Sequence, residues 1–245
     1  MLARPGLTAR LAVGDSLSLP DGGTAVTCGD ANATAKVKGG RATLTSEQLL
    51  ALAPTLGTHA LDWDGTEVTI ERVGAHYATR ADLVAYGVRN GDDFGDTSKY
   101  SVDAVCDAIQ AAEEAIDAGT GRRFCASVAT VALGGGGMTE LPVQDATAIS
   151  VGLLATDRQA MWWGDPATAT VEYGAPLDAR IRQATVQLAA SYLRPRSQAE
   201  NVRGQSVDGV YVSYTLATGD EGAWTGLPFV DAVIEEHRSR RVVVM

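Results

Sequence analysis

The side chains that could carry out catalysis or bind a metal are few and widely spaced. They are three histidines and three cysteines, His59, His76, His237, Cys28, Cys106 and Cys125. Catalysis needs a nucleophile with its base, or an acid and a base that converge. A metal site needs histidines or cysteines at short, regular spacing. The sequence has neither pattern, so it predicts no catalytic residue, no cofactor site and no metal site, and it assigns the cysteines to packing.

Two short motifs resemble ligand-binding loops but lack the residues that such loops need. Four consecutive glycines, residues 134–137, lack the following Lys-Ser/Thr of a phosphate loop, so we interpret them as a hairpin turn. The acidic run at residues 92–96 resembles part of a calcium loop, but the alternating acidic order and the closing glutamate are missing. A solvated acidic loop is the favoured interpretation, with calcium as the minor alternative.

Composition indicates a globular, acidic protein. Hydrophobic residues make up 45% of the chain, and 30 acidic against 20 basic residues give a formal charge of -10. Such a charge repels a phosphate backbone, which argues against a dedicated DNA-binding protein. No apolar run is long enough for a membrane span, and the first residues lack a signal peptide's apolar core, so we expect a protein that stays in the cell that makes it.

Residues 1–76 have the pattern of a small β-sandwich. Short alternating runs at 8–13, 25–28, 33–38 and 41–45 are separated by glycine-rich turns. The clearest element is a hairpin over residues 59–73, because Asp64-Gly65 tolerates the positive φ angles of a two-residue turn. We predict an immunoglobulin-like sandwich, with one helical turn at 46–52.

From Thr79, which can cap a helix, the period changes to that of helices. Helices are predicted at about 80–86, 101–118, 177–194 and 229–238, and the second and third carry apolar stripes that should pack together. Between them, residues 124–173 are predicted to form a β insertion with strands at 124–133, 148–155, 159–163 and 169–173. The fold class is therefore α+β, with domains at 1–76 and 77–245.

Residues 238–245 combine three positive charges with an apolar end: Arg238, Arg240, Arg241, Val242, Val243, Val244 and Met245. Three valines favour an extended strand, and a lone strand needs another backbone to pair with. The pairing strand belongs either to this chain's own sheet or to a partner. A second charged segment precedes it, since residues 91–117 hold eight acids and one base, Lys99.

Four stretches from the second domain resemble the head-tail connector family of tailed phages, also called adaptor or head-completion proteins. They are residues 79–87 (TRADLVAYG), 111–124 (AAEEAIDAGTGRRF), 181–190 (IRQATVQLAA) and 224–228 (WTGLP). The resemblance covers roughly the last two-thirds of the chain. The β domain at 1–76 lies outside it, and its role is open.

The resemblance implies a non-enzymatic subunit of a ring, usually a dodecamer, that docks beneath the portal protein of the virion neck. A stopper or tail-terminator protein would follow on the far side, and DNA would pass transiently through the channel. The tail 238–245 would add a strand to the portal, and helical acids would line the channel: Asp103, Asp107, Glu113, Glu114 and Asp117. The protein would be made in the bacterial host cytoplasm and would have no membrane partner.

A different class of function is a carbohydrate- or host-surface-binding module of a virion. Its binding platforms would be Trp63, Trp162 and Trp163, because indole rings can stack on a sugar. Removal of residues 238–245 separates the two hypotheses, since it should abolish portal docking and spare glycan binding.

Overall fold

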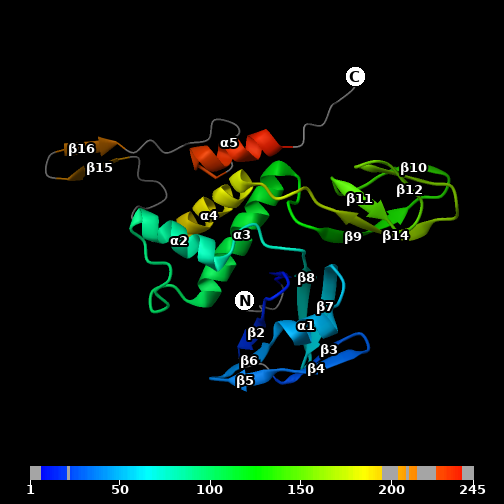
Figure 1. The fold of residues 1–245 in the computed structure, drawn as a ribbon, viewed down its shortest axis with the longest axis horizontal. Coiled ribbons are helices and arrows are strands. Elements are labelled where there is room, and N and C mark those ends of the chain that lie inside the picture. The colour runs from blue at the N-terminus through cyan, green and yellow to red at the C-terminus, as the bar shows by residue number, and fades with distance from the viewer. Residues whose placement is uncertain (1–6, 21–22, 195–203, 208–209, 214–224, 239–245) are drawn as a thin grey trace. The chain divides into compact units, whose positions relative to one another are not determined.

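The computed structural model describes residues 7–20, 23–194, 204–207, 210–213 and 225–238 (Figure 1). The chain divides into two compact units. Unit 1 comprises residues 1–77 and 121–177, and unit 2 comprises residues 78–120 and 178–245. The first segment of unit 1 ends at Tyr77, one residue from the predicted domain boundary at 76/77. The β insertion, which was predicted to belong to the second domain, groups with the N-terminal strands in unit 1. The described residues form small sheets and five helices, which makes the fold α+β.

The N-terminal part of unit 1 packs two sheets and a short helix, α1 (Ser46–Leu52), around one core. Its strands are β1 (Ala9–Leu11), β2 (Leu17–Pro20), β3 (Ala25–Cys28), β4 (Ala31–Thr34), β5 (Lys36–Lys38), β6 (Arg41–Leu44), β7 (Gly57–Trp63) and β8 (Thr66–Arg72). One sheet has the order β1-β8-β7-β3-β4, with β1 parallel to β8, and the other has the order β2-β6-β5. Both sheets turn one apolar face inward, because alternate side chains of a strand point to opposite faces.

The predicted hairpin is confirmed. Strands β7 and β8 pair antiparallel from Gly57 and Arg72 to Trp63 and Thr66. The two turn residues between them have positive φ angles, 50° at Asp64 and 82° at Gly65. The Asp-Gly turn therefore sets the register that places Trp63 in the core, fully buried.

The sequence run 33–38 was predicted as one strand but forms parts of two. Strand β4 belongs to the five-stranded sheet and β5 to the three-stranded sheet. Between them Ala35 is buried, and its N–H donates to the carbonyl of Thr24 at 2.8 Å. A small residue lets the chain cross from one sheet to the other next to the core. Strand β2 was not predicted.

The second β segment of unit 1 contains two more three-stranded sheets around a separate core. The strands are β9 (Ser127–Leu133), β10 (Gly137–Glu140), β11 (Ala146–Ile149), β12 (Leu153–Thr156), β13 (Gln159–Trp162) and β14 (Ala167–Tyr173). The sheet orders are β11-β14-β9 and β10-β13-β12, and all pairs are antiparallel. The predicted run 148–155 is split between the two sheets, and β10 was not predicted.

Both β segments of unit 1 meet through backbone and side-chain contacts. The N–H of Gly74 donates to the carbonyl of Ala126, and the N–H of Phe124 donates to the hydroxyl of Tyr77, each at 2.8 Å. The rings of Tyr77 and Phe124 are 5.8 Å apart in an edge-to-face arrangement. Glu71 also pairs with Arg123. These contacts explain why the insertion groups with the N-terminal strands.

The helices in the described part of unit 2 are α2 (Arg80–Asn90), α3 (Val102–Thr120), α4 (Ala179–Leu193) and α5 (Pro228–His237). Helix α3 packs on α4, and α5 packs on both (Figure 1). The predicted apolar stripes form the contact, since Val105, Ile109, Ala112 and Ile116 of α3 and Ile181, Ala184 and Leu188 of α4 are buried. Thr79 caps α2 as predicted and forms a capping box with Asp82.

Helix α2 does not stop at Gly87, where the sequence predicted its end. It continues to Asn90, and Gly91 closes it with a φ of 80°. A Cβ at position 87 would lie 2.6 Å from the ring of Phe94 and 2.7 Å from the carbonyl oxygen of Asp92. Gly87 is therefore explained by the close approach of the following loop, because only glycine leaves room for it.

Strands β15 (Gly204–Val207) and β16 (Val210–Ser213) pair antiparallel. The limits of the last helix agree with prediction to within one residue, and residues 239–245 of the predicted tail lie outside the described residues. Among the described helices, none has both the length and the hydrophobicity that a membrane span requires.

Candidate interaction surfaces

Helix α3 carries the five acids predicted to line a channel, and they differ in exposure. Glu114 is exposed and accepts a hydrogen bond from the side chain of Gln110 at 2.7 Å. The half-buried members of the set are Asp103, Asp107 and Asp117. Glu113 is fully buried. A channel-lining carboxylate must reach water, which the side chain of Glu113 does not do in this structure.

The spacing of Glu113 from the apolar residues of α3 could have indicated its burial. Glu113 lies four residues after Ile109 and three before Ile116, so it borders the apolar stripe. The alternation of polar and apolar residues placed it on the opposite face. The neighbouring helices cover a wider arc of α3 than the stripe alone indicates.

The C-terminal surface begins at α5, whose inner face is buried through Val230, Val233 and Ile234. The backbone N–H and the hydroxyl of Thr225 both donate to Asp231 at 2.8 Å, which fixes the start of the helix. Arg238 follows the helix, is exposed and lies 3.6 Å from Glu235. The rest of the predicted portal-binding set, Arg240, Arg241, Val242, Val243, Val244 and Met245, lies outside the described residues.

A hydrogen bond from His237 to Asp178 and an ion pair between Arg180 and Glu236 tie the last turn of α5 to the start of α4. The Nε2 atom of His237 lies 2.8 Å from Oδ2 of Asp178, and its Nδ1 atom lies 2.9 Å from the carbonyl oxygen of Val233. Both ring nitrogens face acceptors, so the imidazolium form satisfies both hydrogen bonds. Arg180 pairs with Glu236 beside them. These contacts fix the position from which the chain leaves α5.

Asp178 has a second role as the N-cap of α4. Its Oδ1 atom accepts a hydrogen bond from the N–H of Ile181 at 2.7 Å. Burial alone would raise the pKa of Asp178, but the N–H of Ile181 and the His237 side chain hold it below its ordinary value. The carboxylate is therefore stabilised in its charged form at the helix start, where the helix dipole also favours negative charge.

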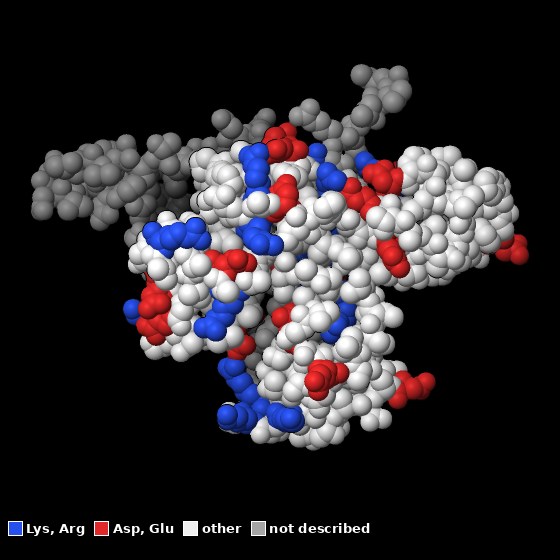
Figure 2. Space-filling model, viewed as in Figure 1, with Lys and Arg blue, Asp and Glu red and all other residues white. Residues whose placement is uncertain are grey.

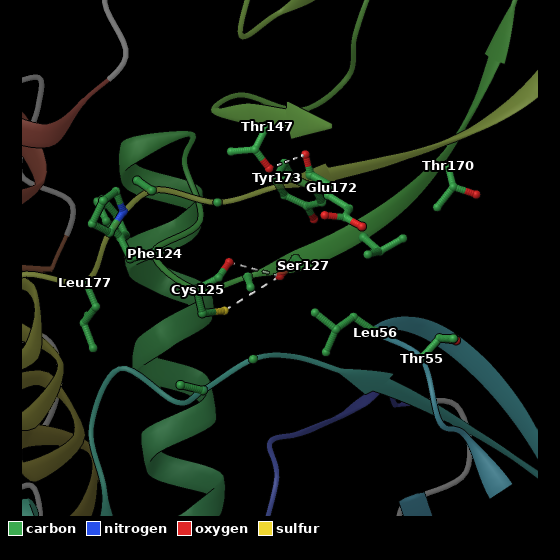
Figure 3. Close-up of a pocket in the computed structure, with 17 residues that line it drawn as sticks. Thr55, Leu56, Phe124, Cys125, Ser127, Thr147, Thr170, Glu172, Tyr173 and Leu177 are labelled. Carbon is green, nitrogen blue, oxygen red and sulfur yellow. Dashed lines mark hydrogen bonds between the residues drawn. The ribbon is translucent and has the colours of Figure 1, made fainter. Parts of the chain in front are cut away.

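Unit 1 contains a cavity of about 830 Å³ between its two β segments (Figure 3). Its wall is mostly apolar, from Leu56 and Gly74 on one side and from residues 124–128 and 172–177 on the other. The hydroxyl of Ser127 donates to the carbonyl of Cys125 at 3.4 Å, and the hydroxyl of Thr147 donates to the carbonyl of Glu172 at 3.3 Å. The hydroxyls of Ser127 and Thr147 thus pair with backbone carbonyls.

Among the described residues that line this cavity, no cysteine or serine lies beside a histidine. The thiol of Cys125 lies 3.7 Å from the hydroxyl of Ser127, and no histidine is in the wall. A cysteine or serine nucleophile needs a neighbouring base to activate it. The apolar part of the wall can hold an apolar group.

Each histidine contacts an oxygen atom of the protein, and the three contacts lie in different places. Nε2 of His59 lies 2.9 Å from the carbonyl oxygen of Thr55, and Nε2 of His76 lies 2.8 Å from Oδ2 of Asp15. Burial alone would raise the pKa of Asp15, but the hydrogen bond and charge of His76 lower it. In the part of the chain that the structure describes, no three metal-ligating side chains come together.

The three tryptophans proposed as sugar platforms are not equivalent. Trp63 is fully buried and donates its indole N–H to the carbonyl of Gly23 at 2.8 Å, so it offers no face to a ligand. Trp162 packs against the second core and donates to the carbonyl of Asp165 at 2.6 Å. Trp163 is 65% exposed. A platform that includes Trp63 is therefore wrong.

No family model matches the sequence, and no curated protein matches it. Chains similar to this one occur in solved neck and virion particles of gene transfer agents. A chain of the native gene transfer agent virion has a TM-score of 0.45 and 20% identity, over 68% of this chain and 91% of that chain.

Two further matches come from necks of gene transfer agent particles. In the native particle with C12 symmetry the TM-score is 0.41 and the identity 18%, over 68% of this chain and 93% of that chain. In the empty particle with C6 symmetry the values are 0.39 and 19%, over 58% and 81%. At these scores the similarities decide neither the fold nor the function of this chain.

Proposed function

We propose that this protein is a structural, non-enzymatic subunit of a bacteriophage neck, forming a ring that docks on the portal and joins the DNA-filled head to the tail. One observation carries this function. The first three stretches that resemble connector proteins lie mainly on α2, α3 and α4, and the fourth leads into α5. These helices form one compact unit although residues 121–177 interrupt them in sequence. The domain boundaries at 1–76 and 77–245 belong to the same proposal.

The channel face of the ring is formed by α3. Its carboxylates with access to solvent are Asp103, Asp107, Glu114 and Asp117. Negative charge repels the phosphate backbone, so DNA passes without being held. The copy number is twelve by similarity to the connector family, and the DNA contact is transient.

The C-terminal tail docks on the portal. Arg238, Arg240 and Arg241 meet an acidic portal surface and guide the encounter, while residues 242–244 add a strand to a portal sheet. The Asp178 and His237 contact fixes the origin of this tail at the end of α5. A stopper or tail-terminator protein binds the opposite side of the ring.

The N-terminal strands form an immunoglobulin-like module at the outside of the ring. Two sheets around one core support this part of the proposal, with Leu17, Leu44, Leu61 and Trp63 among the shared core residues. The module widens the ring and supplies surfaces beyond the helical unit.

Removal of residues 239–245 tests the portal contact. Full-length and shortened chains are mixed with isolated portal rings and examined by co-sedimentation and electron microscopy. The shortened chain should not bind, and Arg240→Glu with Arg241→Glu should bind more weakly, with a defect that grows at low salt. Arg89→Glu with Lys99→Glu is the control, because it makes the same charge change on exposed residues of unit 2. Undiminished docking of the shortened chain would contradict the function.

A second candidate function is a carbohydrate- or host-surface-binding module of the virion, favoured by the exposed indole of Trp163. Glycan-array binding by the full-length chain tests it, with Trp163→Ala as the matched variant. Binding that persists without residues 239–245 and disappears in Trp163→Ala would favour this function over the neck subunit.

A further inference from the structure

The outer face of the small sheet β2-β6-β5 is basic. In this sheet Ala42 and Leu44 point into the core, so their neighbours Arg41 and Thr43 point outward. Lys38 pairs with Arg41 and Lys36 pairs with Thr43, which places all three positive charges on the outer side. Lys36, Lys38 and Arg41 are exposed, and Figure 2 shows basic side chains gathered over β5. We call these three residues the basic face.

The outer face of the five-stranded sheet carries the opposite charge. Asp62 of β7 and Glu67 of β8 lie directly opposite each other, and both are exposed. Their neighbours Leu61 and Val68 are buried, so the two carboxylates point away from the core. The two arginines of this sheet, Arg10 of β1 and Arg72 of β8, are buried, and its strands carry no lysine. We call Asp62 and Glu67 the acidic face.

Two like charges directly across a strand pair destabilise the sheet. The pair at Asp62 and Glu67 is therefore an unfavourable arrangement for a chain that works alone, and positive charge brought from outside would offset it. The only exposed Lys and Arg side chains among residues 7–20 and 23–77 are Lys36, Lys38 and Arg41 of the basic face. They belong to the other sheet of the same module.

The two faces point in opposite directions. Both sheets contribute their inner side chains to one core, Leu17 and Ala42 from the small sheet and Leu61 and Val68 from the large one. Their outer faces must then lie on opposite sides of the module. One copy thus presents positive charge on one side and negative charge on the other, which suits a head-to-tail contact and not a two-fold contact.

We propose that the basic face of one copy docks on the acidic face of the next copy, so that the N-terminal modules associate head to tail. Repeated contacts of this kind close into a ring when the rotation between copies permits it. The occupant is a second copy because the chain itself supplies both charges. A nucleic acid fits less well, because three positive charges on a chain of formal charge -10 would neutralise few phosphates. This inference deepens the proposed ring, on which it rests, by naming one of its subunit contacts.

Paired charge reversals test the contact. One variant carries Lys36→Glu and Lys38→Glu, which makes both faces acidic. The other carries Asp62→Lys and Glu67→Lys, which makes both faces basic. Self-association of the full-length chains is measured by sedimentation velocity over a concentration series at low salt. Each variant alone should associate about tenfold or more weakly than the wild type, because attraction is replaced by repulsion.

A mixture of the two variants and a chain with all four substitutions test whether the partner of each face is a second copy. An equimolar mixture of the two variants should regain association, since each copy then meets the opposite charge on both sides. A chain with all four substitutions should also regain it. A wild type that stays monomeric at low salt, or a mixture no more associated than its components, would overturn the inference.

Loss of DNA binding or of portal binding in the Lys36 and Lys38 variant, with unchanged self-association, would assign the basic face to that other partner and overturn the inference. Asp62 accepts a hydrogen bond from the N–H of Gly65 at 2.7 Å, so its replacement could disturb the hairpin turn. Glu67 lies outside the Asp64-Gly65 turn, so the single variant Glu67→Lys serves as a control for misfolding. The proposed function is tested separately by portal binding of the tail-shortened chain, so the two can fail independently.

Discussion

Asp178→Ala should destabilise unit 2 because it removes two hydrogen bonds together. The carboxylate caps α4 through the N–H of Ile181 at 2.7 Å, and it accepts a hydrogen bond from His237 at 2.8 Å. Loss of an N-cap costs about 1 kcal/mol. The Asp178 side chain is 46% exposed, so solvent screening keeps the ion pair at about 0.2–1 kcal/mol. Together the free energy of unfolding should fall by about 1–2 kcal/mol.

Asp178→Asn is the matched variant, because its amide oxygen can still cap the helix while the charge is absent. It should lose only the smaller part. Urea unfolding followed by far-UV circular dichroism gives the stability, and hydrogen exchange of the first amides of α4 gives the local effect. Each kcal/mol should also lower Tm by about 2–4 °C. An Asp178→Ala protein as stable as the wild type, or an Asn variant as unstable as the Ala variant, would refute the reasoning.

The same hydrogen bonds predict how the effect depends on pH. Burial would raise the pKa of Asp178, but the hydrogen bonds from Ile181 and His237 outweigh it and the pKa in the folded protein is lowered. The contribution is therefore complete above the unfolded aspartate pKa of about 3.9 and is lost as pH falls through the lower, folded value. The stability difference between wild type and Asp178→Ala should shrink in that acidic range.

Three further substitutions test packing, backbone conformation and charge elsewhere. Gly87→Ala should destabilise unit 2 by about 1–3 kcal/mol, because the new Cβ would lie 2.6 Å from the ring of Phe94. Gly91 has a φ of 80° and open space around it, so Gly91→Ala should cost about 1–2 kcal/mol of stability from backbone conformation alone. Denaturant unfolding compares the two, and a harmless Gly87→Ala would contradict the close approach. Burial would raise the pKa of Asp15, but His76 lowers it, so the charged carboxylate stabilises unit 1. That stabilisation is lost as pH falls through the folded pKa of Asp15. In Asp15→Asn the free energy of unfolding should therefore depend less on pH in the acidic range. An unchanged acid transition would exclude this role.

Local signals in the sequence predicted the local structure well. The Asp64-Gly65 turn, the Thr79 cap and the apolar stripe of α3 each depend on a few adjacent residues, and each has the expected form. The helix limits at α4 and α5 differ from prediction by one or two residues. Such features could be predicted because turn geometry, capping and helical periodicity are set within one or two turns of the chain.

Features that depend on distant partners could not be predicted in this way. The run 33–38 alternates like one strand, but Ala35 is buried where the chain changes sheets. Glu113 borders the apolar stripe of α3, but the sequence pattern does not say how wide an arc of that helix its neighbours cover. The grouping of the insertion with the N-terminal strands depends on Glu71, Tyr77 and Gly74 finding partners about fifty residues later. No periodicity encodes those pairings.

Charge placement shows the same dependence on register. The formal charge of -10 opposes association of two copies at long range, whatever their orientation. Within a Debye length of about 8–10 Å the local faces dominate over the net charge. Strand pairing places Lys36 and Lys38 on one outer face and Asp62 and Glu67 on the other. An acidic chain can then attract a second copy in one orientation and repel it in others, which is the selectivity that a closed ring of identical subunits needs.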